Sequence, residues 1–149
     1  MEIFVKHYTE LTRDELYEIL RARAEVFVVE QNCPYQDLDC KDLDAYHVYM
    51  REDGEIVGYL RVLRRGVSYP DTASIGRVIT TARGRGRGIG LQLVLEGIKV
   101  AKEKFGESEL TISAQKYAVG FYEKAGFVPT DIEYLEDGIP HVRMLYGRK

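Results

Sequence analysis

Apolar residues recur along the chain with helical and strand-like spacings, and these spacings predict where the regular elements lie. Thr12, followed three residues later by Glu15, forms a capping box that is typical of a helix start. The next apolar residues are three or four positions apart, as in one buried helical stripe: Leu16, Ile19, Leu20, Ala24 and Phe27. We therefore expect an amphipathic helix that packs on a sheet.

Segments rich in apolar and β-branched residues predict the strands of that sheet. They cover residues 3–7, 46–51, 55–63, 73–81, 109–113 and 141–146, and another strand starts at Phe127. Asp53-Gly54 and Asp137-Gly138 supply the positive backbone angles of tight turns, so each pair predicts a hairpin.

Two further helices and one long loop complete the expected order of elements. A helix follows the glycine-rich string at 82–90, and residues 116–125 form another that ends at Gly126. Residues 32–44 carry proline, asparagine and several aspartates, which favour turns, so a long and functional loop is expected there.

This order predicts an α/β fold with a mixed, mostly antiparallel sheet of about seven strands flanked by about four helices. A chain of 149 residues suits a single domain, 1–149. Apolar residues make up 45% of it and charged residues 30%, as is ordinary for a folded protein.

Charge and composition exclude several classes of function. The net charge is −3, and basic residues cluster only at Arg83, Arg85 and Arg87, which suits a small anion better than nucleic acid. The beginning of the chain lacks a signal-peptide pattern, and no segment is apolar enough to cross a membrane, so we expect a cytoplasmic protein. Cys33 and Cys40 match no disulfide or zinc pattern, which predicts free thiols and no metal.

The glycine-rich string is the first candidate site. It lies where a strand hands over to a helix, so its backbone N–H groups and the helix N-terminus can receive a phosphate. The phosphate-loop motif requires Lys-Ser/Thr after its second glycine, whereas Leu91 and Gln92 follow Gly90. A dinucleotide-binding fold would require alternating strands and helices from the start.

The string resembles the coenzyme A motif R/Q-x-x-G-x-G/A of the GNAT acetyltransferases, with Arg85, Gly88 and Gly90 at its fixed places. The resemblance implies that backbone groups of the preceding strand bind the pantetheine arm and that the loop amides bind the pyrophosphate of acetyl-coenzyme A. The cofactor-binding residues implied in this way are Val78, Ile79, Thr80, Arg85, Gly86, Arg87, Gly88, Ile89 and Gly90.

A second segment, residues 115–127, resembles the family pattern N-x-x-A-x-x-x-Y-x-K-x-G-F. Gln115 stands where the family usually has asparagine, at a position that contacts the pantetheine arm. Tyr122 matches the tyrosine that lies near the thioester sulfur and acts as general acid toward the departing thiolate. Phe121 and Phe127 are interpreted as core residues.

Three further segments, residues 27–39, 75–78 and 136–141, are similar to ElaA-type members of the superfamily. The resemblance implies transfer of an acetyl group to a primary amine by direct attack. The amine must first lose a proton, because its pKa is near 10. Candidate bases beside the acceptor side are Glu30, His47 and His141, and the N–H of Ile79 or Thr80 is a candidate oxyanion donor.

The acceptor is expected to be a small-molecule amine or a protein amine, and a homodimer is also expected from the resemblance. Arg21, Arg23 and the acidic loop after Pro34 are candidates for shaping acceptor access, and an acidic edge would favour a cationic amine. Three alternatives remain open: an acyl-homoserine-lactone-synthase-like acyltransferase, suggested by Arg23 and Phe27, a non-catalytic coenzyme A sensor, and a protein-interaction module.

Overall fold

Seven strands form one mixed sheet in the computed structural model, which describes residues 2–147. The sheet order is β1-β2-β3-β4-β5-β7-β6, and every neighbouring pair is antiparallel except β4 and β5. The strands are β1 (Glu2–His7), β2 (Tyr46–Glu52), β3 (Glu55–Leu63), β4 (Ala73–Thr80), β5 (Leu110–Gln115), β6 (Val128–Glu136) and β7 (Ile139–Tyr146).

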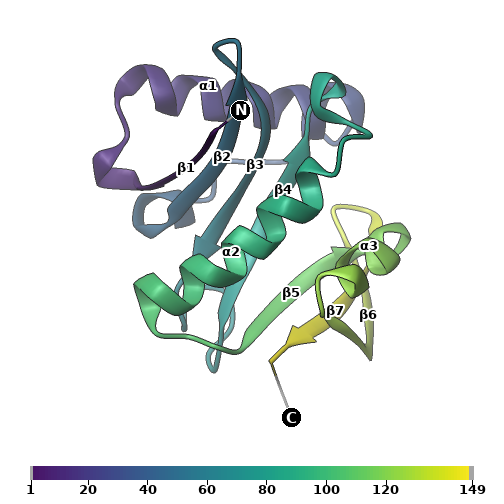
Figure 1. Cartoon of the computed structure of the whole chain (residues 1–149). Helices are drawn as coiled ribbons and strands as arrows, with labels where there is room; N and C mark the ends of the chain where they lie inside the picture. Colours follow the sequence, from purple (N-terminus) through teal and green to yellow (C-terminus); the bar gives the residue numbers. More distant parts are fainter. Residues whose placement is uncertain (1, 148–149) are drawn as a thin grey trace.

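The parallel pair in the middle opens the sheet. Strands β4 and β5 are paired only through Ala73 with Leu110 and Ser74 with Thr111, and they diverge beyond that point (Figure 1). Within residues 2–147, the rest of β4 therefore has no strand partner on the side that faces β5, and its backbone groups there are available to a ligand.

Helix α1 (Arg13–Arg23) lies on one face of the sheet (Figure 1). The predicted capping box is confirmed: Thr12 Oγ accepts from the N–H of Glu15, and the Glu15 carboxylate accepts from the N–H of Thr12. The helix continues as a π-helical segment, Ala24–Glu30, a geometry that is frequent at functional sites. Its buried stripe packs against side chains of three strands: Tyr49, Tyr59 and Ile79.

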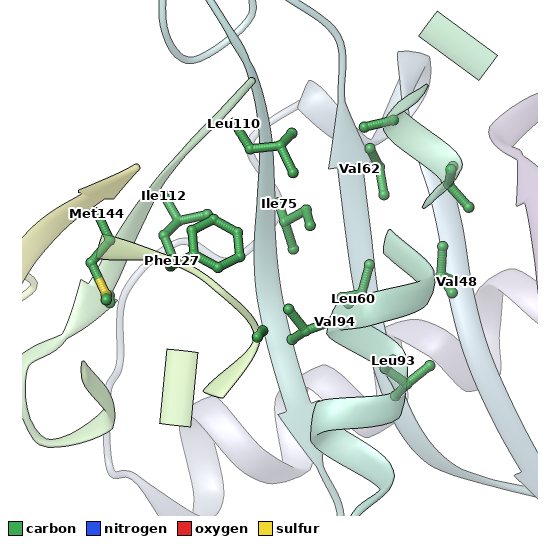
Figure 2. Packing of buried hydrophobic residues seen from close by; sticks show 14 of the residues in the cluster. Val48, Leu60, Val62, Ile75, Leu93, Val94, Leu110, Ile112, Phe127 and Met144 are labelled. Carbon is green, nitrogen blue, oxygen red and sulfur yellow. The ribbon is translucent and has the colours of Figure 1, made fainter. Parts of the chain in front are cut away.

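Helix α2 (Ile89–Phe105) crosses the opposite face (Figure 1). Leu93 and Val94 of this helix pack on Leu60, Val62 and other strand residues, as Figure 2 shows. The same core continues across the opening through Ile112, Phe127 and Met144, so it joins the two halves of the sheet under the cleft.

Most of the predicted elements are confirmed. Asp53 and Gly54 have φ of 50° and 80°, and Asp137 and Gly138 have φ of 53° and 75°, as the two hairpins require. Residues 116–125 are more divided than predicted, because a 3-10 turn, Lys116–Ala118, precedes α3 (Val119–Lys124). Among residues 2–147 there are three α-helices, and none has the length and apolar character needed to cross a bilayer.

Candidate active site

A cleft of about 780 Å³ lies at the opening between β4 and β5. Its walls come from segments far apart in the sequence: the π-helical turn and the loop after it, β4, the end of β5 with α3, and the β6–β7 hairpin. Such a concave site at a break in a sheet is where a substrate is expected to bind.

A bulge in β4 shapes one wall. The pairing of β3 with β4 shifts by one residue between Tyr59 and Arg61, which leaves an extra residue in β4. At the bulge, Arg77 has φ of 53°, a left-handed conformation that is unfavourable for a residue with a side chain. The bulge thus breaks the ladder where β4 lines the cleft.

The hydrogen bonding of β4 shows which backbone groups face the cleft. The N–H of Thr81 donates to the carbonyl of Val57 at 3.0 Å, and Ile79 is paired with Tyr59, so both residues use their β3-facing groups. Because N–H directions alternate along a strand, the N–H of Thr80 faces the opposite side, toward the cleft. Of the two oxyanion donors predicted, Thr80 therefore has the suitable orientation, and Ile79 does not.

The glycine-rich loop leads directly into the N-terminus of α2. Gly86 and Gly88 have φ of 77° and 74°, so both positions require glycine-like backbone freedom, and Gly88 is the N-cap of α2. A Cβ on Gly90 would lie 3.2 Å from the ring of Phe121, which ties the loop closely to α3. The Ile89 side chain is buried in the core, so only its backbone N–H can serve a ligand.

The three arginines of this loop have different surroundings. Arg83 and Arg87 form ion pairs with Glu52 of the β2–β3 hairpin, so their side chains are engaged there. Only Arg85 lines the cleft, where its guanidinium pairs with Glu30 of the π-helical turn. The loop therefore offers one arginine side chain to an anion in the cleft, and Glu30 occupies that side chain.

Gln115 and Tyr122 line the other side of the cleft. The Gln115 amide nitrogen donates to Gln31 Oε1 at 3.4 Å, which is a second polar contact across the cleft. Burial raises the pKa of Tyr122, so its phenol stays protonated and can donate a proton.

His141 lies at the end of the cleft formed by the β6–β7 hairpin. Its Nδ1 lies 2.7 Å from the carbonyl of Ile139, which can only accept, so Nδ1 carries a proton and, in the neutral ring, Nε2 is the acceptor. Nε2 is 3.4 Å from a carboxylate oxygen of Glu136, which is also 3.4 Å from the hydroxyl of Ser113. His141 is only 6% exposed, yet it lines the cleft.

Sequence reasoning missed Glu136 and Ser113 as partners of this histidine, because β5, β6 and β7 meet only in the folded sheet. A signal was present in the Asp137-Gly138 turn, which returns the chain so that Glu136 and His141 lie near one another across the hairpin.

His47, the third candidate base, lies elsewhere. It is fully buried, its Nε2 donates to the carbonyl of Asp42 at 3.0 Å, and its Nδ1 accepts from the hydroxyl of Tyr59 at 2.7 Å. Burial lowers its pKa and keeps it neutral. Because both nitrogens are satisfied and the residue does not line the cleft, it has a structural role here.

Most aspartates of the acidic loop pair with arginines and do not line the cleft. Asp42 bridges the buried guanidiniums of Arg23 and Arg61 at 2.7 and 2.9 Å, and Asp39 binds Arg61 with both carboxylate oxygens. Only Asp37 among them lines the cleft. Arg23 is fully buried, so it supports the loop from beneath and does not line the cleft.

The structure also shows the surroundings of Arg21 and of the two cysteines. Arg21 pairs on the surface with Glu18 and Glu25 and does not line the cleft. Cys33 and Cys40 are free, and burial together with the Asp137 carboxylate raises the pKa of Cys33. Within the described range, His, Cys, Asp and Glu side chains form no group of three that could hold a metal.

The site thus combines a divided sheet, a bulged β4 and a glycine loop that begins a helix, and comparison with known proteins shows the class of protein to which it belongs. The sequence profile described as "Acetyltransferase (GNAT) domain" matches residues 9–146. The chain therefore belongs to the GNAT acetyltransferase family, whose members use acyl-coenzyme A as co-substrate.

Within the family the chain is similar to ElaA-type proteins. Protein ElaA of Escherichia coli is 39% identical over 140 residues, which is 93% of this chain and 91% of ElaA. A crystal structure described as an acyl-CoA N-acyltransferase from Pseudomonas aeruginosa is 38% identical, with a TM-score of 0.90 over 99% of this chain and 100% of that one.

The fold is also shared with the acyl-homoserine lactone synthase BjaI, described as CoA-dependent. That structure has a TM-score of 0.77 over 96% of this chain and 81% of its own, at 17% identity. At this identity the likeness extends to the fold alone, so it does not favour lactone synthesis by this chain.

Proposed function

We propose that this chain is an N-acetyltransferase that moves the acetyl group of acetyl-coenzyme A directly to a primary amine. The observation that carries the proposal is one cleft that contains both a proton acceptor, His141, and a proton donor, Tyr122, beside the loop expected to hold the coenzyme. Such a pair of groups is what direct transfer to an amine requires.

The residues of the loop and of β4 fit the coenzyme. The first N–H groups of α2 have no partner within the helix. Together with the side chain of Arg85 they suit a pyrophosphate. The unpaired edge of β4 at Val78 and Thr80 suits the amide groups of the pantetheine arm, as a neighbouring strand would. Bound acetyl-coenzyme A supplies the activated acetyl group.

The acceptor end suits a protonated amine. Nε2 of His141 and the carboxylate of Glu136 are both acceptors and lie side by side, so an ammonium group can donate to both. Asp137 adds a second carboxylate to this rim. We therefore favour a cationic amine, on a small molecule or a protein, with the attraction coming from the hairpin and not from the acidic loop.

His141 takes a proton from the ammonium, and the neutral nitrogen then attacks the thioester carbonyl. The N–H of Thr80 stabilises the oxyanion that forms. As the carbon–sulfur bond breaks, Tyr122 gives its proton to the thiolate and regains one from the nitrogen. The nitrogen loses two protons and the sulfur gains one, so one proton leaves through His141.

Calorimetric titration with acetyl-coenzyme A, followed by an amine panel read by mass spectrometry, tests the proposal. Gly88→Trp should abolish saturable binding, because it adds bulk and strain at the cradle. Gly54→Trp is a matched control, since Gly54 also has positive φ but lies in the β2–β3 turn. Folded wild type that binds no acetyl-coenzyme A, or binds it and acetylates no amine, would contradict the proposal.

A further inference from the structure

Arg77 joins two walls of the cleft. Its backbone forms the bulge of β4, and its side chain reaches the long loop on the acceptor side. Its Nε donates to Asp37 Oδ1 at 2.7 Å, and its terminal nitrogen donates to the Asp37 carbonyl at 3.1 Å. A residue held in a strained conformation by such contacts indicates a function for the constraint.

Asp37 is held from two sides. The Nε of the buried Arg23 donates to the other carboxylate oxygen, Oδ2, at 2.9 Å, and another nitrogen of Arg23 donates to the same carbonyl at 3.1 Å. The carboxylate thus lies between two guanidiniums, one on α1 and one on the β4 bulge, with one oxygen bound to each. Charge-assisted contacts in this forked arrangement fix position as well as charge.

The position of Asp37 distinguishes it from the other loop aspartates. Asp42 binds Arg61 beneath the loop, and Asp39 binds Arg61 and has a longer contact of 3.4 Å with Arg77, whereas Asp37 lines the cleft itself. Its immediate neighbours on the acceptor wall, Tyr35 and Gln36, also line the cleft. The shorter contact of Arg77, at 2.7 Å, is with Asp37, so the distance from this wall to the bulged strand is set mainly there.

We propose that Asp37 and Arg77 are positioning residues that hold the acceptor wall at a fixed distance from the bulged strand, so that the amine meets the thioester in line. The proposal rests on the proposed function. Neither residue needs to touch the reacting atoms, because a displacement of about 1 Å can cost on the order of 100-fold in rate.

Asp37→Asn is the first test, since it keeps the shape of the side chain and removes its charge. We expect kcat/KM for the amine to fall about 30-fold, whereas the affinity for coenzyme A, held by the loop at 85–90, changes less than about threefold. Asp44→Asn is the matched control, because Asp44 is in the same loop but pairs with Arg64 away from the cleft, and it should leave both constants unchanged.

Arg77→Lys is a second variant in case Asp37→Asn does not fold. It keeps the charge but loses the two-point contact with Asp37. We therefore expect a smaller fall in kcat/KM for the amine, again with little change in the affinity for coenzyme A. Non-additive losses in the double variant would identify the pair as one unit. If both variants match the Asp44→Asn control, or if amine and coenzyme constants fall together, the proposal is overturned.

A second readout does not depend on turnover. Cys33 lies on the same wall, so its alkylation rate, measured in a Cys40→Ser background, reports how firmly the wall is held. Asp37→Asn should raise this rate about tenfold and Asp44→Asn should not. If the wild type transfers no acetyl group, faster alkylation still supports the wall contact, and an unchanged rate overturns it.

Discussion

The two ends of the cleft are built in different ways. The end proposed to bind the coenzyme, here called the coenzyme end, consists of β4, the glycine loop and the start of α2, which are continuous in the chain. The end proposed to bind the amine, here called the acceptor end, brings together the π-helical turn and the loop at 31–44 with the β6–β7 hairpin, about a hundred residues further along the chain. The first depends on local backbone geometry, and the second on long-range pairing of charges.

This difference explains which features of the site can be predicted from a single sequence. A glycine-rich turn between a strand and a helix exposes backbone N–H groups to an anion wherever it occurs, so a short sequence motif is sufficient to predict such a site. Asp42 of the loop, in contrast, pairs with Arg23 and Arg61, which belong to other elements and lie beside it only in the folded chain. The two ends should therefore respond separately to mutation.

The largest effect is expected from Asp42→Asn, which removes a charge from the acceptor end. The change leaves the buried guanidiniums of Arg23 and Arg61 without the carboxylate that bridges them, which should cost about 3 kcal/mol in the free energy of unfolding. Urea titration measures the loss, and Asp44→Asn, at an exposed pair, should stay within about 0.5 kcal/mol. Equal losses in the two variants would contradict a special role for the buried charges.

The same contact predicts an acid limit to stability. Burial acts to raise the pKa of Asp42, but Arg23 and then Arg61 outweigh it and hold the pKa below its usual value. A depressed pKa in the folded state stabilises the fold above about pH 4, and the contribution is lost as pH falls further. The urea midpoint of the wild type should therefore fall below pH 4 more steeply than that of Asp42→Asn.

His141→Gln should have the next largest effect, a fall in kcat on the order of 100-fold, because glutamine cannot take the ammonium proton. His47→Gln is the contrasting variant, since His47 is buried away from the cleft and should change stability more than kcat per folded molecule. Calorimetry with acetyl-coenzyme A should show normal affinity in His141→Gln. Full activity of His141→Gln would rule out this residue as the base.

Tyr122→Phe should reduce kcat less, by about tenfold. A thiol has a pKa near 8.5, so its thiolate departs readily and depends only in part on protonation. Transfer from acetyl-coenzyme A to the best amine of the panel measures the effect. Phe121→Leu is a packing control, because Phe121 contacts Gly90 and Tyr122 but carries no acidic proton.

Much of the fold could be predicted from sequence because its signals are local. The Thr12–Glu15 capping box and the Asp53-Gly54 turn depend on a few adjacent residues, and the structure has both. The bulge at Arg77 could not be predicted, since it exists only relative to the register of β3. Likewise, the burial of His47 depends on which strands flank it, so its chemistry could not be judged from position in the chain.

The smallest effect concerns the ion pair that joins the π-helical turn to the glycine-rich loop. Glu30, on the acceptor side, pairs with Arg85, the loop arginine that lines the cleft, so a pyrophosphate must compete with it. Both side chains are partly exposed, at 30% and 49%, so the pair contributes little, and Glu30→Gln should tighten coenzyme A binding only about threefold.

Calorimetric titration at low and moderate salt measures this change, which should shrink as salt screens the pair. Glu25→Gln is the matched control, because Glu25 pairs with Arg21 on the same helical segment but outside the cleft. A Glu30→Gln variant that binds coenzyme A normally yet loses about 100-fold in kcat would instead make Glu30 the base. The acceptor end would then act on the thioester from the π-helical turn, and the hairpin histidine would serve only to orient the amine.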